Sequence, residues 1–107
     1  MNRLQQLKAF HDEDPNDSFV RFAIASEYLK LDRKDEALEA FEGLVDNDPA
    51  YVGTYYHLGK LYECLGETEK AVETYKKGIE VAREASDQHS LSELQSALLE
   101  AEGIGFD

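Results

Sequence analysis

The fold is decided by residues 48–83, which read DPAYVGTYYHLGKLYECLGETEKAVETYKKGIEVAR. Residues 14–49 follow the same plan, and the Asp14-Pro15 pair returns as Asp48-Pro49 at an offset of 34 residues (49 − 15 = 34). Further positions match at this offset: Tyr28 and Tyr62, Leu31 and Leu65, Ala37 and Ala71, Glu39 and Glu73, Phe41 and Tyr75. A period of this length, with helical spacing of apolar residues inside each unit, indicates a stacked array of helical hairpins.

The composition of the chain is that of one ordered helical domain. It has 107 residues, 42% of them hydrophobic, with two prolines, seven glycines and no tryptophan. This length allows one real core but not two, and the hydrophobic content excludes a disordered chain.

The charge of the chain restricts its partners. Eleven Lys and Arg residues stand against 23 Asp and Glu residues, which gives a net charge of −12. Because the summed field repels phosphate backbones and anionic lipid, we expect neither nucleic acid nor a membrane surface as partner. Cationic or mostly apolar protein partners are favoured.

The cellular compartment is inferred from the cysteine count and the apolar runs. Cys64 is the single cysteine and cannot form an internal disulfide, which fits a reducing compartment. The first eight residues lack the apolar core of a secretion signal, and no apolar run approaches the roughly 20 residues of a membrane span. We therefore expect a cytoplasmic protein.

Apolar spacing and capping residues predict six helices. Their expected ranges are 2–12, 17–31, 35–46, 50–64, 68–86 and 90–102. Asp14 is expected to cap the second helix with Pro15 in its first turn, and Gly66 to end the fourth in a left-handed turn. Ser90 and Glu93 have the spacing of a capping box for the last helix.

The two units resemble the tetratricopeptide repeat family, whose pattern is Trp-x2-Leu-Gly-x2-Tyr…Ala-x3-Phe…Pro. The second unit reads Tyr55-x2-Leu58-Gly59-x2-Tyr62…Ala71-x3-Tyr75, and the first reads Arg21-x2-Ile24-Ala25-x2-Tyr28…Ala37-x3-Phe41…Pro49. The resemblance covers about residues 14–83. It implies an all-α, right-handed superhelix of two hairpins, with a capping helix at each end.

Two departures from the family pattern affect the expected organisation. Arg21 replaces a large apolar residue, which indicates a more exposed edge, and Arg83 stands where the next proline would fall. Two repeats are fewer than such stacks usually need, so we expect terminal helices to cover the ends. The expected organisation is a single domain, 1–107, with an N-terminal helix 2–12, repeats 14–47 and 48–86, a capping helix 88–102 and a tail 103–107, docked through Ile104 and Phe106 or frayed.

The sequence offers little for catalysis, cofactors or metals. Residues 12–23 begin like a calcium loop, but Asp17 stands where glycine is needed and Ala23 replaces the final acid. The three histidines lack helical zinc spacing. His57 and Cys64 are two helical turns apart, about 10 Å, too far for a nucleophile and its base. We expect no enzyme, no cofactor and no metal site.

The resemblance implies a binding surface on the concave side, lined by the first helix of each hairpin. The inner-facing positions implied are Phe19, Phe22, Ala23, Ser26, Lys30, Gly53, Tyr56, His57, Lys60 and Cys64. Phe22 and Tyr56 hold equivalent places and are expected to anchor apolar side chains, while Lys30 and Lys60 are expected to meet a partner carboxylate. The alternative is that both aromatic residues pack internally, the lysines are only solvated and His57 has no role.

These expectations indicate that the chain is a binding protein. The chain is interpreted as an adaptor or scaffold that holds a peptide or protein segment on its concave face. The alternative is a self-assembling protein whose exposed apolar patches pair two copies into a homodimer. The carboxylate clamp of one tetratricopeptide subclass is not carried over, because its lysine and asparagine positions hold Phe22, Ser26 and His57.

Overall fold

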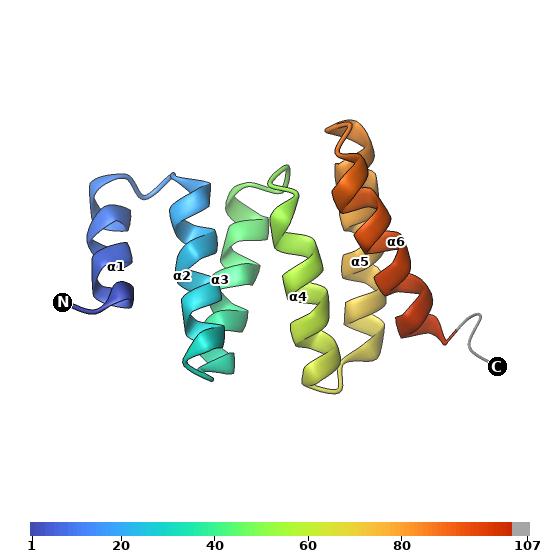
Figure 1. Ribbon diagram of the computed structural model, residues 1–107, viewed down its shortest axis with the longest axis horizontal. Helices are drawn as coiled ribbons and strands as arrows, with labels where there is room; N and C mark the ends of the chain where they lie inside the picture. The colour runs from blue at the N-terminus through green and yellow to red at the C-terminus, as the bar shows by residue number, and fades with distance from the viewer. Residues whose placement is uncertain (104–107) are drawn as a thin grey trace. The chain divides into compact units, whose positions relative to one another are not determined.

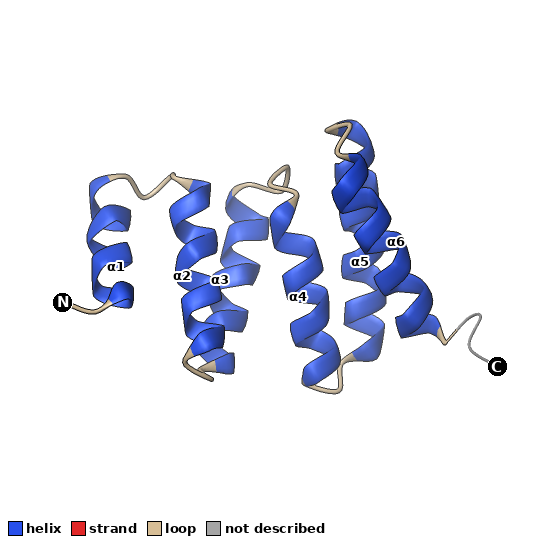
Figure 2. Ribbon diagram, viewed as in Figure 1, coloured by secondary structure: helices blue, strands red, loops and turns tan. Residues whose placement is uncertain are grey.

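The computed structural model describes residues 1–103, which form six helices and no strand (Figures 1 and 2). The helices are α1 Arg3–Glu13, α2 Ser18–Lys30, α3 Lys34–Asn47, α4 Gly53–Cys64, α5 Thr68–Glu84 and α6 Gln88–Glu102. The predicted all-α helical repeat fold is confirmed. Residues 104–107, which hold most of the expected tail with Ile104 and Phe106, lie outside the described residues.

The helices divide between two compact units. The first unit, residues 1–51, contains α1, α2 and α3, and the second, from residue 52 onward, contains α4, α5 and α6. The expected organisation as one domain, 1–107, with repeats 14–47 and 48–86, stays a prediction. None of the helices described is both long enough and apolar enough to cross a membrane.

The predicted N-terminal cap of the second helix is wrong. Asp17, not Asp14, caps α2 and accepts a hydrogen bond from the Val20 N–H at 3.3 Å. Asp14 instead ends α1 and turns the chain, because its side chain accepts from the Asn16 N–H at 3.2 Å. A proline two residues ahead of the cap therefore lies in the turn and not in the helix.

The capping box expected at Ser90 and Glu93 is also absent. The cap of α6 is Asp87, whose carboxylate accepts from the Ser90 N–H at 3.0 Å and from the Ser90 hydroxyl at 2.8 Å. Ser90 thus serves as a donor three residues inside the helix. These bonds to the charged form hold the pKa of Asp87 below its ordinary value.

Equivalent left-handed residues end the first helix of each hairpin. Asp32 has φ 58° after α2, and Gly66 has φ 79° after α4, at the same repeat position. The stop predicted at Gly66 is confirmed. Aspartate tolerates this backbone region better than most residues, which explains how the first unit makes the same turn without glycine.

In the first unit, α2 packs against both α1 and α3. Ala25 and Ala37 are fully covered, as are Phe41 and Leu44 of α3. Phe22 packs its ring edge-on to Phe41, with centroids 6.0 Å apart. Small residues on one helix and large ones on the next let the pair approach closely.

In the second unit, α5 packs against α4 and α6, and two glycines make these contacts possible. A Cβ on Gly59 of α4 would overlap the buried ring of Tyr75, reaching 2.6 Å from its Cζ. A Cβ on Gly78 of α5 would lie 2.5 Å from the Cβ of Tyr55 and 3.1 Å from the methyl carbons of Leu94. The packing of α4 on α5, and of both on α6, therefore requires glycine at these two positions.

We predict that Gly59→Ala lowers the free energy of unfolding by about 2 kcal/mol, because the Tyr75 ring has no room to move in a packed core. Urea unfolding followed by circular dichroism measures this. Gly43→Ala is the matched control: Gly43 lies inside α3 and an added Cβ meets nothing within 4 Å. It should stabilise the chain by about 1 kcal/mol through helix propensity. Equal effects of the two changes would contradict the role of Gly59.

Candidate functional site

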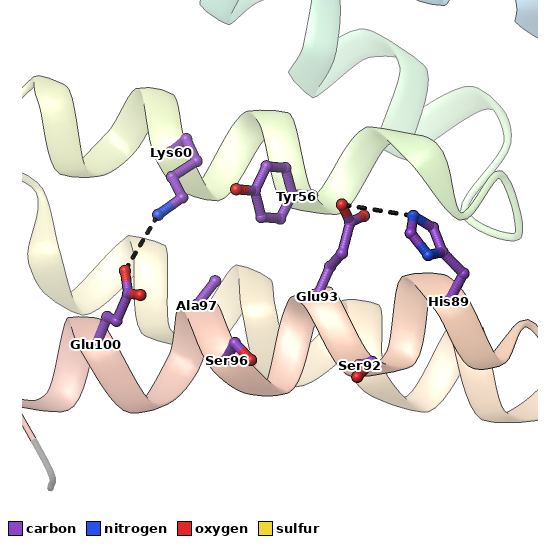
Figure 3. Close-up of a pocket in the computed structure, with 8 residues that line it drawn as sticks. All are labelled: Tyr56, Lys60, His89, Ser92, Glu93, Ser96, Ala97 and Glu100. Carbon is purple, nitrogen blue, oxygen red and sulfur yellow. Dashed lines mark ion pairs between the residues drawn. The ribbon is translucent and has the colours of Figure 1, made fainter.

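A pocket of about 310 Å³ lies between α4 and α6 within the second unit (Figure 3). Its lining residues are Tyr56, Lys60, His89, Ser92, Glu93, Ser96, Ala97 and Glu100. Figure 3 shows Tyr56 and Lys60 reaching from α4 toward Glu93, Ala97 and Glu100 of α6.

Helical spacing explains why these residues share one pocket. Tyr56 and Lys60 are four residues apart, so they lie on one face of α4, while Tyr55 and Leu58 point into the core. On α6 the lining residues recur at spacings of three and four, beside the buried Leu94. Serine and alanine at the middle of this face are too small to fill the space opposite the tyrosine ring.

The charges of the pocket are dominated by carboxylates. Lys60 Nζ lies 3.7 Å from Glu100 Oε2 and 3.8 Å from Glu63 Oε2, and 5.5 Å from the ring centroid of Tyr56. Glu93 Oε2 lies 3.6 Å from His89 Nε2, an ion pair only when that histidine is protonated. Lys60 is therefore paired with two carboxylates, and Glu93 is a further acid in the pocket lining.

The position of Glu63 is fixed by a hydrogen bond from Tyr75. The Tyr75 hydroxyl donates a hydrogen bond to Glu63 Oε2, and its ring is fully buried. The pKa of Tyr75 is raised far above its ordinary value. Burial is the larger cause, and the hydrogen bond to this carboxylate is the second. The phenol stays protonated and keeps Glu63 positioned for Lys60.

His57 lies beside the pocket and not in its lining. Its ring is edge-on to Tyr56, with centroids 5.7 Å apart. Partial burial lowers the pKa of His57, and the carboxylate of Glu93 opposes that shift. The imidazole is therefore neutral at pH 7.

The predicted site residues fall into two groups, one in each unit. Phe19, Phe22, Ser26 and Lys30 lie on α2 of the first unit, and Gly53, Tyr56, His57 and Lys60 lie on α4 of the second. Phe19 is 65% exposed and Lys30 is exposed, whereas Phe22, Ser26, Gly53, Tyr56 and Lys60 are half-buried. Their joint role in one concave surface stays a prediction.

Within the first unit, the Phe22 ring packs on its own neighbours. It lies 5.8 Å from the ring of Tyr51 as well as against Phe41. Phe22 is half-buried, so internal packing and exposed surface are both present at this residue. Tyr56, by contrast, lines an open pocket.

Sequence reasoning missed the contribution of α6. The signal was present as Glu93, Ser96, Ala97 and Glu100, a stripe with helical spacing on the side away from Leu91 and Leu98. A solvent-facing stripe of small and acidic residues has the same appearance when it has no function. Only the packing of α6 on α4 places it opposite Tyr56.

Comparison with known sequences shows the family. The sequence model of the tetratricopeptide repeat matches residues 1–81. The chain belongs to the tetratricopeptide repeat family. A curated tetratricopeptide repeat-containing protein of Methanocaldococcus jannaschii is 28% identical over 82 residues, which cover 72% of this chain and 26% of that protein. The chain thus spans about a quarter of the length of that relative.

Solved structures agree with this assignment. The solution structure of a tetratricopeptide repeat domain protein from Salinibacter ruber is 61% identical, with a TM-score of 0.80 over 84% of this chain and 91% of that one. The TPR2B domain of yeast Sti1, solved as a complex with pHsp70, has a TM-score of 0.85 at 19% identity and covers 94% and 80% of the two chains. The latter likeness is one of fold alone.

We predict that Tyr75→Phe lowers the free energy of unfolding by about 1.5 kcal/mol at pH 7, because Glu63 loses a buried donor. The raised pKa of the folded state favours folding below the unfolded tyrosine pKa of about 10 and is lost as the pH rises above it. Wild-type stability should therefore fall more steeply between pH 9 and 11 than that of Tyr75→Phe. Parallel urea-unfolding profiles over this pH range would contradict the assignment.

Proposed function

We propose that this tetratricopeptide protein is a non-enzymatic interaction module that binds a segment of another protein, with the α4–α6 pocket as an anchoring point. The observation that carries the proposal is the half-buried ring of Tyr56 facing a wall of small and acidic side chains across an open pocket of about 310 Å³. A pocket of this size takes one or two side chains of a peptide. Repeat stacks use such surfaces for binding partners.

The charges of the pocket favour a basic or apolar partner side chain over an acidic one. Lys60 was expected to meet a partner carboxylate, but Glu63 and Glu100 already offset its charge. A further carboxylate would approach a net negative site, whereas an arginine or lysine would find Glu93 and the face of Tyr56. This agrees with the net charge of −12.

The remaining predicted residues are proposed as further contacts, each within its own unit. Gly53 at the start of α4 is proposed as a contact in the second unit, and Phe19, Phe22, Ser26 and Lys30 of α2 are proposed as contacts in the first. Phe19 is 65% exposed, and Lys30 is exposed as well. The fold of the chain supports this use, since the yeast Sti1 domain that shares it was solved with pHsp70 bound.

Self-assembly is the second candidate function, and a groove between α5 and α6 favours it. This groove of about 610 Å³ is lined by the apolar Ile79, Leu98 and Leu99 and by the polar Lys76, Glu80, Arg83 and Gln95. An apolar groove bordered by both charges is suited to a second copy of the chain. Light scattering over a hundredfold dilution tests this, because a homodimer dissociates and a monomer does not change.

We predict that peptides selected from a random display library carry a basic residue next to an apolar one. Tyr56→Ala should weaken their binding about tenfold, as expected when an aromatic anchor is lost. Glu93→Gln should weaken the basic peptides and spare apolar ones. Calorimetric titration measures both effects.

The control for this experiment is Phe10→Ala. Phe10 is 55% exposed on α1 and does not line the pocket, so the change removes apolar surface without altering the pocket lining. Binding should not change. Selection of acidic peptides, or full binding by Tyr56→Ala, would place the interaction elsewhere.

A further inference from the structure

The first unit contains a separate pocket of about 380 Å³ among α1, α2 and α3. Its lining residues are Lys8, His11, Asp12, Arg21, Ile24, Tyr28 and Ala40. No residue of this pocket belongs to the site proposed above. Its chemistry differs as well, because cations rather than carboxylates dominate it.

The pocket occurs where the first repeat departs from the second. Arg21 holds the repeat position of Tyr55, whose side chain is almost fully buried in the second unit. The Arg21 side chain turns toward the α1–α2 loop, where its Nε–H donates to the Pro15 carbonyl at 2.8 Å. The buried Ile24 and Tyr28 remain as an apolar floor beside a charged wall.

Two cations at this pocket form no ion pair among the described residues, although, after the hydrogen bond from Arg33, the charge of Lys8 contributes to lowering the pKa of Glu36. Among residues 1–103, neither Lys8 nor Arg21 forms an ion pair, whereas Arg33, Lys34, Lys60 and Lys70 do. Seven of the eleven Lys and Arg residues form no ion pair within residues 1–103, and Lys8 and Arg21 are the two of them that line this pocket. The Lys8 ammonium lies 5.5 Å from the ring centroid of Tyr28. Unpaired cations beside an apolar floor offer charge to a ligand from outside the chain.

A third polar group points to the same conclusion. The Nδ1 atom of His11 is buried and has no hydrogen-bond partner among the described residues. Buried polar atoms are normally paired, so the part of the pocket wall formed by His11 carries an unsatisfied polar group. The acid that lines the pocket is Asp12, while the nearby Glu36 is held by Arg33 through two bonds of 2.6 Å.

We propose that this pocket binds an aspartate or glutamate side chain of a partner protein, with the carboxylate between Lys8 and Arg21 and an adjacent apolar side chain on Ile24 and Tyr28. Net negative charge on the whole chain does not prevent this. Exposed charges are screened within about 8 Å at physiological salt, so the nearby cations determine the local preference. The protein would then contact a partner through two sites of opposite preference, one per unit.

An NMR titration of the full chain with blocked tripeptides tests this. Acetyl-Leu-Glu-Leu-amide should shift backbone amide signals of α1 and of α2 around Arg21, while the matching glutamine and lysine peptides should not. Isovalerate is the small-carboxylate probe, and it should bind at the same signals but at least five times more weakly. Equal affinity of isovalerate would overturn the assignment to a protein segment, and shifts caused equally by the glutamine peptide would overturn the proposal.

Variants that remove a positive or a negative charge should change the affinity for the glutamate peptide in opposite directions. Lys8→Gln and Arg21→Gln should each weaken the glutamate peptide about fivefold, as the loss of a charge-assisted contact does. Asp12→Asn should strengthen it about twofold by removing a repulsion of exposed charges. Arg21→Lys should keep most of the affinity, and Tyr56→Ala all of it. Lys8 is exposed, so its variant folds; no loss of affinity in Lys8→Gln would overturn the proposal.

Discussion

The structure of the second unit depends on the contact between Gly59 and the ring of Tyr75. The ring is fully buried, and a single methyl group on Gly59 would occupy the same space. Because this contact sets the distance between α4 and α5, it also sets the position of the face of α4 that carries Tyr56 and Lys60. The Tyr75 hydroxyl then reaches Glu63 and holds the carboxylate that pairs with Lys60. One packing contact thus positions both a core residue and a residue of the candidate site.

The same pairing of small and large residues occurs twice on α5. Gly78 admits Tyr55 on one side and Leu94 of α6 on the other. This brings α6 against the hairpin and creates the wall opposite Tyr56. The pocket is therefore a consequence of core packing, and its acidic side chains are displayed by a helix whose other face is committed to the core.

The fold was largely predictable from the sequence because the determining residues repeat. Ala37 and Ala71, like Phe41 and Tyr75, recur at a fixed offset, and their burial follows from helical spacing alone. The exact helix starts were not, because Asp14, Asp17 and Pro15 offer several caps within four residues. The choice among them depends on where the packed helix must begin, which a local pattern does not contain.

Only the residues that α4 contributes to the candidate site could be predicted from the sequence. Tyr56 and Lys60 were found because they hold implied inner positions of a repeat, and the residues of α6 were not, since α6 has no repeat pattern. The prediction that Lys60 meets a partner carboxylate took no account of Glu63 and Glu100. These two acids of the chain itself pair with Lys60, one from its own helix and one from α6. Ion pairing between helices depends on side-chain direction, which spacing along one helix does not give.

A departure from the repeat pattern is itself informative. At the position where the second unit buries Tyr55, the first has Arg21, and the expected consequence was an exposed edge. Arg21 is half-buried, and thus more exposed than Tyr55, and it lines a pocket with an apolar floor. An arginine can do this because its long stem packs while its charged end stays accessible. The repeat thus fixes the backbone of both hairpins, and one exchanged side chain changes a core position into a place for charge.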